Sequence, residues 1–186
     1  MLTSFIMLPL FILIFIFLLI RLIKKKYNIF VFLGQIVFLI YIFYLLKVTF
    51  FNIPYQKELI RDYHKDGYQL AYNFIPFKSI KEIIEMNRNN FSIILRQIGG
   101  NLILILPMGI YMSTVYNRLS KFKNFFIFII CIAASIEFIQ FLLNIIVTVQ
   151  FRSVDIDDII LNVIGGCIGY LLHFAIKPLY KYATTD

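Results

Sequence analysis

The chain has 186 residues, of which 61% are hydrophobic and only 15% are charged, and its formal net charge is +8. A soluble domain of this size would have too few polar residues to cover its apolar surface, and the length leaves no room for a separate soluble enzyme domain. Membrane proteins keep Lys and Arg in cytoplasmic loops, which explains the positive charge without a nucleic-acid partner.

Five apolar segments are long enough to cross the hydrocarbon core of a bilayer, for which about 20 helical residues suffice. They cover residues 2–23, 29–51, 91–116, 125–149 and 155–178. The first is followed by lysines and has no small-residue cleavage pattern, so we expect a retained helix and not a signal peptide. The sequence therefore predicts an all-α, polytopic bundle of about five transmembrane helices, with residues 1–186 forming a single integral membrane domain.

The connection over residues 52–90 is polar and mixed in charge. Pro76 disfavours a helical conformation at Ile75. Beyond it, Ile80, Ile83 and Ile84 recur at helical spacing, which predicts a short amphipathic helix over residues 79–86. We expect this helix to lie on the membrane surface.

Basic residues predict the orientation of the chain in the membrane. With five spans, the first connection, the third connection and the C-terminus lie on the same side. Their basic residues are Arg21, Lys24, Lys25, Lys26, Arg118, Lys121, Lys123, Lys177 and Lys181. Because Lys and Arg are enriched in cytoplasmic loops, the N-terminus is predicted outside and the C-terminus inside.

Polar residues of the last three predicted helices gather toward the predicted outer half of the membrane. Glu137 is the costliest, because a charge near the bilayer centre costs from ~3 to over 10 kcal/mol unless it is paired or faces a cavity. Arg96 and Arg152 are its expected partners. Gln140 shares the helix face of Glu137, and Asn101 adds an amide early in the third helix.

The fifth helix opens with three acidic residues, Asp155, Asp157 and Asp158, followed one turn later by Asn162. Asp155 is explained as an N-cap, and acidic residues complement the positive end of a helix dipole. Three acidic residues are more than capping needs, so the binding of a cation, an arginine or an amine-bearing ligand is an alternative. Mg²⁺ held by Asp157, Asp158 and Glu137 is one alternative. No cofactor or metal ligand set is predicted.

Glycines mark helix faces where backbones approach closely. Gly165 and Gly169 form a small-xxx-small pair with Gly166 beside them, and Gly99 and Gly100 are assigned the same role. Dimerisation through these faces, giving a homo-oligomer, stays open. In the third helix, Pro107 is predicted to produce a kink.

Four segments, residues 73–77, 100–109, 135–140 and 155–166, resemble the motifs of the VanZ-like family, in the same order. The resemblance covers about residues 43–172. It implies an accessory envelope protein associated with resistance to teicoplanin, a glycopeptide with a lipid tail. The family's polar motif positions correspond to Asn73, Asn101, Glu137, Gln140, Asp155, Asp158 and Asn162.

The leading hypothesis is a membrane protein that binds a lipid-tailed antibiotic or a lipid-linked envelope intermediate at an outward polar pocket, with membrane lipids as its other partners. The polar cluster is either that pocket or a structural network that fixes helix register. Its members are Asn73, Arg96, Asn101, Glu137, Gln140, Arg152, Asp155, Asp158 and Asn162. A membrane enzyme that modifies a lipid headgroup, and a small transporter, are the alternatives.

Overall fold

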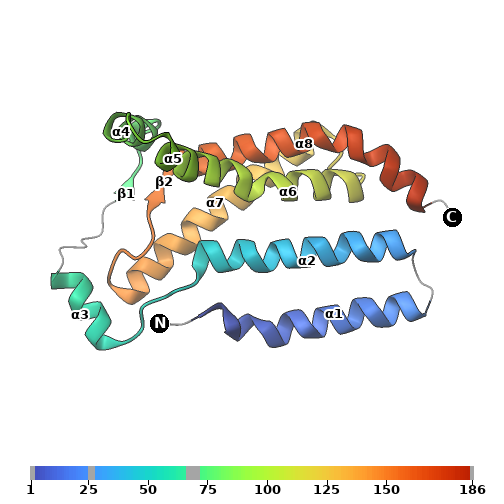
Figure 1. The fold of residues 1–186 in the computed structure, drawn as a ribbon, viewed down its shortest axis with the longest axis horizontal. Coiled ribbons are helices and arrows are strands. Elements are labelled where there is room, and N and C mark those ends of the chain that lie inside the picture. The colour runs from blue at the N-terminus through green and yellow to red at the C-terminus, as the bar shows by residue number, and fades with distance from the viewer. Residues whose placement is uncertain (1–2, 25–27, 66–71, 185–186) are drawn as a thin grey trace.

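Five long helices form the body of the molecule, seen in a computed structural model that describes residues 3–24, 28–65 and 72–184 (Figure 1). They are built from η1 (Ser4–Met7) with α1 (Leu8–Ile23), α2 (Ile29–Phe50), α5 (Phe91–Ile94) with η2 (Leu95–Gly99) and α6 (Gly100–Val115), α7 (Phe122–Val147) and α8 (Ile156–Thr184). Each is long and apolar enough to cross a membrane. The predicted all-α polytopic fold is confirmed, and the chain is a multi-pass membrane protein with five candidate spans.

The helix ends differ from the prediction where proline and backbone geometry intervene. α8 continues through Pro178 to Thr184 instead of ending at the proline. Proline removes one hydrogen bond, which membrane helices tolerate. α7 ends at Val147, and the next residue, Thr148, adopts a left-handed conformation with φ 64°.

The third span contains a π-helical turn that the sequence pattern does not reveal. This turn, η2, separates the single turn α5 from α6. An extra residue in a helical turn rotates the side chains that precede it, and such turns are frequent at functional sites. α6 then continues through Pro107, and the Tyr41 hydroxyl donates to the Leu104 carbonyl at 2.8 Å, one turn before the proline.

The long connection between α2 and α5 is more ordered than the sequence indicated. The predicted amphipathic helix is present as α4 (Lys78–Met86), but α3 (Lys57–Lys65) was not predicted. β1 (Tyr72–Asn73) pairs in parallel with β2 (Val154–Asp155), so that Asn73 lies opposite Asp155. Two-residue strands are too short to show an alternating pattern. This pairing attaches the connection to the start of α8.

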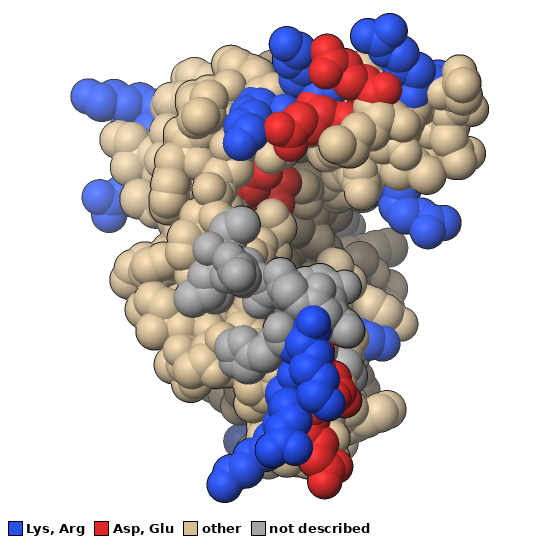
Figure 2. All heavy atoms as spheres, turned by 90° about the vertical axis from the view of Figure 1, so that its left-hand side faces the viewer, with Lys and Arg blue, Asp and Glu red and all other residues tan. Residues whose placement is uncertain are grey.

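The two ends of the bundle differ in character. α3, α4 and both strands lie at one end, called here the loop end, whereas α1, α6 and α8 finish at the opposite end (Figure 1). Viewed from the loop end, side chains of both charge signs gather in two groups at opposite margins of the face (Figure 2). This mixture agrees with the near balance of charge in residues 52–90.

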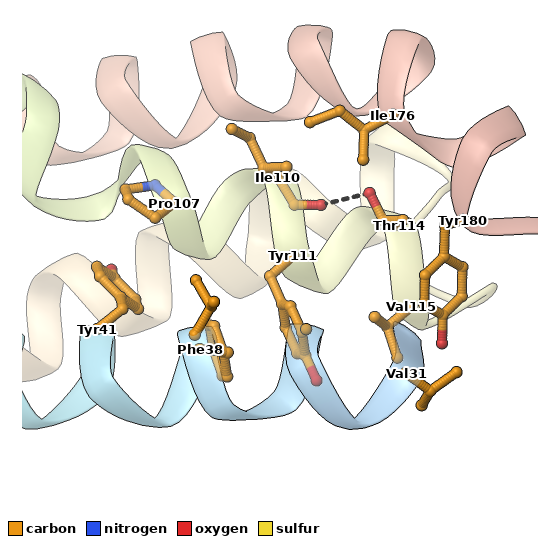
Figure 3. A pocket seen from close by; sticks show the side chains of 12 residues that line it. Val31, Phe38, Tyr41, Pro107, Ile110, Tyr111, Thr114, Val115, Ile176 and Tyr180 are labelled. Carbon is orange, nitrogen blue, oxygen red and sulfur yellow. Dashed lines mark hydrogen bonds between the residues drawn. The ribbon is translucent and has the colours of Figure 1, made fainter. Parts of the chain in front are cut away.

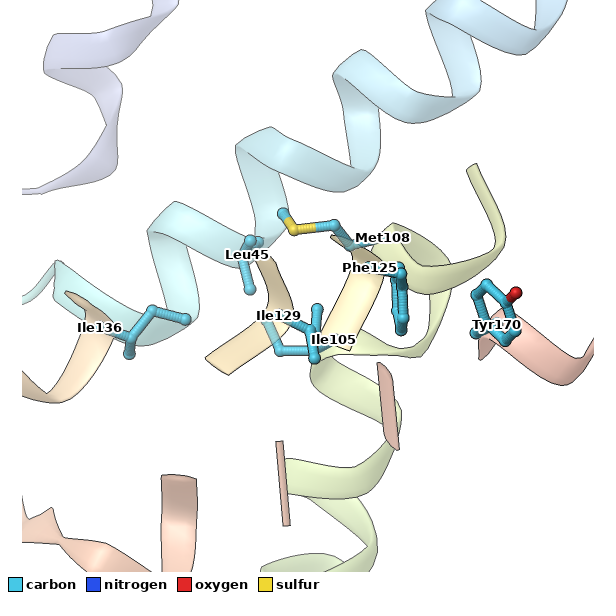
Figure 4. Packing of buried hydrophobic residues seen from close by; sticks show 7 residues of the cluster. All are labelled: Leu45, Ile105, Met108, Phe125, Ile129, Ile136 and Tyr170. Carbon is cyan, nitrogen blue, oxygen red and sulfur yellow. The ribbon is translucent and has the colours of Figure 1, made fainter. Parts of the chain in front are cut away.

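The core lies where α2, α6, α7 and α8 meet. Its buried hydrophobic residues are Leu45, Ile105, Met108, Phe125, Ile129, Ile136 and Tyr170 (Figure 4). Burying an apolar side chain removes it from water or replaces lipid contacts by close protein packing. α1 contributes no buried residue, so it lies outside this core.

Glycines bring α6 and α8 into backbone contact. A Cβ atom at Gly165 would overlap the Leu102 carbonyl oxygen, and one at Gly169 would overlap the Leu106 carbonyl oxygen. Gly109, to which the sequence assigned no packing role, faces the Gly166 carbonyl oxygen in the same way. The absence of side chains at this contact allows the two helices to approach closely.

Gly99 and Gly100 make no close contact with another helix among the described residues. Nothing lies within 4 Å of a Cβ atom built on Gly100, and one on Gly99 meets only the side chain of Leu95 in its own turn. The reason is that Gly100 borders a cavity instead of a neighbouring helix.

Candidate functional site

Asp155 organises the junction between the β-strand pair and α8. Its Oδ1 accepts the backbone N–H of Asp157 at 2.9 Å, so Asp155 caps α8 in the way its position predicts. The same oxygen accepts the side-chain amide of Asn73 at 2.8 Å, and that amide also lies 2.9 Å from the Ser79 hydroxyl. Asn73 and Asp155 therefore join the connection to α8.

Asp157 belongs to α8 but caps α4. Its carboxylate accepts the backbone N–H of Phe77 and, at 3.1 Å, that of Ile80. The N-cap position of α4 is occupied by Phe77, which has no side-chain acceptor and adopts φ 64°. An N-cap without a side-chain acceptor leaves these N–H groups to water or to another part of the protein, and this is the signal that the sequence offers for the Asp157 contact.

Glu137 is 5% exposed and accepts the backbone N–H of Asp155 at 3.0 Å. In the part of the chain that the structure describes, no ion pair joins Glu137 to Arg96 or Arg152, so the expected pairing is wrong. Arg96 is exposed on the π-helical turn. The Glu137 carboxylate instead contacts the backbone N–H at the start of α8 and lines the cavity described below.

Arg152 and Asn144 fix the segment between α7 and α8. The Asn144 side chain, which is fully buried, donates to the Arg152 carbonyl at 2.8 Å and accepts its N–H at 3.3 Å. Arg152 Nη2 donates to the Phe51 carbonyl at 2.6 Å. Burial lowers the pKa of the Arg152 guanidinium. Sequence reasoning missed Asn144, although it follows Gln140 by four residues and so shares its helix face.

A cavity of about 190 Å³, called here the polar cavity, brings most of the predicted cluster together. Its polar lining residues are Thr49, Asn101, Glu137, Gln140, Arg152, Ser153, Asp158 and Asn162. The Asn101 side-chain amide donates to the Asp158 carboxylate, and Gln140 Nε2 donates to the Thr49 carbonyl at 3.1 Å. Two carboxylates and one guanidinium thus face a single space built from α2, α6, α7, α8 and the α7–α8 connection.

A second cavity of about 430 Å³, the outer cavity, adjoins the polar cavity. The two share Asn101, Ser153 and Asp158 in their walls. The outer cavity adds the exposed Arg96 from η2, together with Ile80 and other residues of α4. α4 therefore forms one wall of the approach to the polar cavity.

An apolar groove of about 310 Å³ lies on the other side of Glu137. Its lining residues are Phe74, Ala134, Glu137, Phe138, Phe141, Val154, Asp155, Ile156 and Ile159. Glu137 lines both this groove and the polar cavity. Glu137 thus lies between an apolar surface on the spanning helices and a polar interior.

A fourth space, about 330 Å³ in volume, lies between α2, α6 and α8 toward the opposite end of the bundle (Figure 3). It is lined by aliphatic and aromatic residues such as Phe38, Tyr41 and Pro107. The Thr114 hydroxyl is already used, because it donates to the Ile110 carbonyl at 2.7 Å. This cavity contains no charged group and is separate from the polar cluster.

Among the residues that the structure describes, three polar atoms of the polar cavity lining are buried without a hydrogen-bond partner: Gln140 Oε1, Arg152 Nε and Asn162 Oδ1. An unsatisfied buried polar group costs about 1–3 kcal/mol. Three such atoms around one cavity favour a site for a polar ligand over a completed structural network.

The geometry gives no support to the Mg²⁺ alternative. Both carboxylate oxygens of Asp157 accept backbone N–H groups of the α4 region. Among residues 3–24, 28–65 and 72–184, no group of three or more His, Cys, Asp or Glu side chains is arranged to hold a metal ion.

The chain belongs to the VanZ/LLP1 family, whose model matches residues 38–177. It is 26% identical over 134 residues to Protein VanZ of Enterococcus faecium, an alignment covering 72% of this chain and 69% of that relative. No solved structure gives a significant match. Every residue that lines the polar cavity lies within the matched region.

Proposed function

We propose that this member of the VanZ/LLP1 family lies in a bacterial cytoplasmic membrane with its loop end outward, and that its polar cavity binds the head of a lipid-tailed molecule there. The orientation is supported by the basic residues near the opposite end, among them Arg118, Lys121 and Lys177. A cavity that opens outward is accessible to molecules of the outer leaflet and of the cell wall.

The observation that carries the proposal is the position of Glu137 between the polar cavity and the apolar groove. A molecule with a polar head and a lipid tail needs both environments side by side at membrane depth. The polar cavity supplies carboxylates, amides and a guanidinium for the head. The groove, lined by side chains such as Phe138 and Ile159, supplies an apolar surface for the tail.

The ligand is a lipoglycopeptide antibiotic of the teicoplanin type or a lipid-linked envelope intermediate. Binding the antibiotic withdraws it from its target, and binding the intermediate shields it from the antibiotic. Either route contributes to low-level teicoplanin resistance, which the family resemblance of the sequence motifs implies. The similarity to Protein VanZ, at 26% identity, supports this role.

A membrane enzyme that modifies a lipid headgroup is the second candidate, favoured by one observation. Glu137 and Asp158 line the same cavity as Arg152, which places a potential general base near a group that can bind phosphate. Turnover of a lipid-linked substrate by the purified protein would distinguish this candidate from simple binding.

The test is expression of the wild-type chain and of Glu137→Ala in a teicoplanin-susceptible bacterium. The wild type is expected to raise the teicoplanin concentration that stops growth, and Glu137→Ala is expected to abolish the increase at equal membrane abundance. Glu58→Ala, an identical change on the exposed surface of α3, serves as the matched control and should behave as the wild type. Equal tolerance of the wild type and Glu137→Ala would refute the proposal.

A further inference from the structure

Four hydrogen-bond donors around the polar cavity already donate to other protein groups. Gln140 Nε2 donates to the Thr49 carbonyl, and the Thr49 hydroxyl donates to the Leu45 carbonyl at 2.7 Å. The Asn101 amide donates to the Asp158 carboxylate. Arg152 Nη2 donates to the Phe51 carbonyl. These four donors therefore already have protein partners, and Arg152 Nε is a buried donor of the lining that lacks one.

Acceptors, in contrast, remain available in the same wall. Gln140 is buried, with 8% of its surface exposed, and its Oε1 has no partner. The amide orientation follows from the bond between Nε2 and the Thr49 carbonyl, because only nitrogen can donate there. Glu137 uses one oxygen for the Asp155 N–H, and Asp158 uses one for Asn101, so each carboxylate has a second oxygen.

We propose that the polar cavity binds a primary ammonium group, carried by the head of an envelope lipid or lipid-linked molecule. The inference rests on the proposed function and names the chemistry of its ligand. An ammonium has three donors and no acceptor, which complements an acceptor-rich wall. It also balances the formal charge, since two carboxylates face one guanidinium in the lining.

The size of the polar cavity fits a small substituent of the ligand's head. At about 190 Å³ it is smaller than the ~300–1,000 Å³ of pockets that enclose drug-sized ligands. The remainder of the headgroup occupies the adjoining outer cavity of about 430 Å³. There Arg96 faces it, and a guanidinium is suited to a phosphate group.

Arg152 Nε, a buried donor of the lining without a partner, can also donate to such a headgroup. A headgroup in which a short chain links the ammonium to a phosphate ester also contains phosphate oxygens. One of these oxygens accepts from Arg152 Nε, while the ammonium donates to Gln140 Oε1 and to the two carboxylates. A purely anionic ligand would instead meet Glu137 and Asp158 unfavourably.

The experiment measures lipid binding to the purified full-length protein in detergent by native mass spectrometry. The probes are phosphatidylethanolamine, phosphatidylcholine and phosphatidylglycerol with identical acyl chains. The first two differ only in the three methyl groups that replace the N–H donors. The wild type is expected to bind phosphatidylethanolamine at least about tenfold more tightly than either other lipid, because hydrogen bonds to charged groups are lost.

Glu137→Gln and Asp158→Asn remove negative charge with little change of shape, and each is expected to reduce the preference to within about twofold. Glu58→Gln is the matched control and should retain it. Thermal unfolding of each variant checks that it is folded. Equal binding of the three lipids, preference for phosphatidylglycerol, or an unchanged preference in Glu137→Gln would overturn the proposal.

Soluble glycerophosphoethanolamine and glycerophosphocholine distinguish the source of the amine. Displacement of the lipid by the first alone identifies a water-soluble amine as a sufficient ligand, and no displacement by either restricts the site to lipids. The lipid preference decides the proposal in both cases. Teicoplanin tolerance without ammonium preference refutes this inference alone, and ammonium preference without tolerance refutes the antibiotic role alone.

Discussion

The Asp157 carboxylate accepts the backbone N–H of Ile80 at 3.1 Å, across 77 residues of sequence. A residue in the first turn of one helix thereby caps another helix that the sequence places in a loop. Together with the Asn73–Asp155 hydrogen bond and the β1–β2 pair, this cap fixes α4 as a wall of the outer cavity.

Asp157→Ala is expected to loosen α4 while leaving the five spans intact, because an N-cap is worth about 0.5–2 kcal/mol. Hydrogen–deuterium exchange of peptides covering Lys78–Met86 should accelerate about tenfold, in keeping with a loss of ~1.4 kcal/mol. Asp62→Ala, an exposed change on α3, is the control. Unchanged protection of α4 in Asp157→Ala would show that other contacts hold this helix.

Gly165→Ala is expected to separate α6 from α8, because the new methyl group would overlap the Leu102 carbonyl oxygen. Overpacking of this kind costs about 1–3 kcal/mol. The measurement is the midpoint of thermal unfolding of the purified protein. Gly34→Ala is the matched control, since nothing lies within 4 Å of a Cβ atom built on Gly34. It should leave the midpoint unchanged or raise it. Similar midpoints for the two variants would contradict the close packing.

Asn144→Leu is expected to release the α7–α8 connection, because the Arg152 N–H and carbonyl both lose their partner. Leaving buried groups unsatisfied costs about 1–3 kcal/mol each. Maleimide labelling of a Ser153→Cys variant, in a background with Cys131 and Cys167 replaced by Ser, reports the mobility of the connection. Labelling should accelerate in Asn144→Leu and stay constant in the exposed control Asn89→Leu. Equal labelling rates in all three proteins would show that Asn144 does not hold the α7–α8 connection.

Single cysteines test the proposed orientation. In the same cysteine-free background, Glu58→Cys at the loop end is expected to react with a membrane-impermeant maleimide in intact cells. Lys121→Cys, exposed at the opposite end, should react only after the membrane is permeabilised. The reverse pattern would invert the topology and place the polar cavity toward the cytoplasm.

Local sequence patterns were sufficient for features whose cause is local. The five spans follow from hydropathy over about 20 residues, and the amphipathic α4 follows from the spacing of its isoleucines. The capping of α8 by Asp155 depends on residues two apart. The helical faces of Glu137 and Gln140 follow from helix periodicity alone.

Other features could not be read from the chain because their partners are distant in sequence. The two-residue strands β1 and β2 exist only through their mutual pairing. The packing contact of Gly109 lies on α8, whereas Gly100, which looked equivalent in sequence, borders a cavity. The π-helical turn before α6 leaves no mark in the hydrophobic pattern.

The amino-acid sequence by itself determined that this chain is a multi-pass membrane protein with five candidate spans, and it determined which helix faces carry the polar residues. Only the tertiary structure decided what those residues contact: Glu137 binds the backbone of Asp155 and not an arginine, and Asp157 caps α4. The physical reason is that helix periodicity sets the direction of a side chain, whereas the packing of separate helices sets which group lies opposite it.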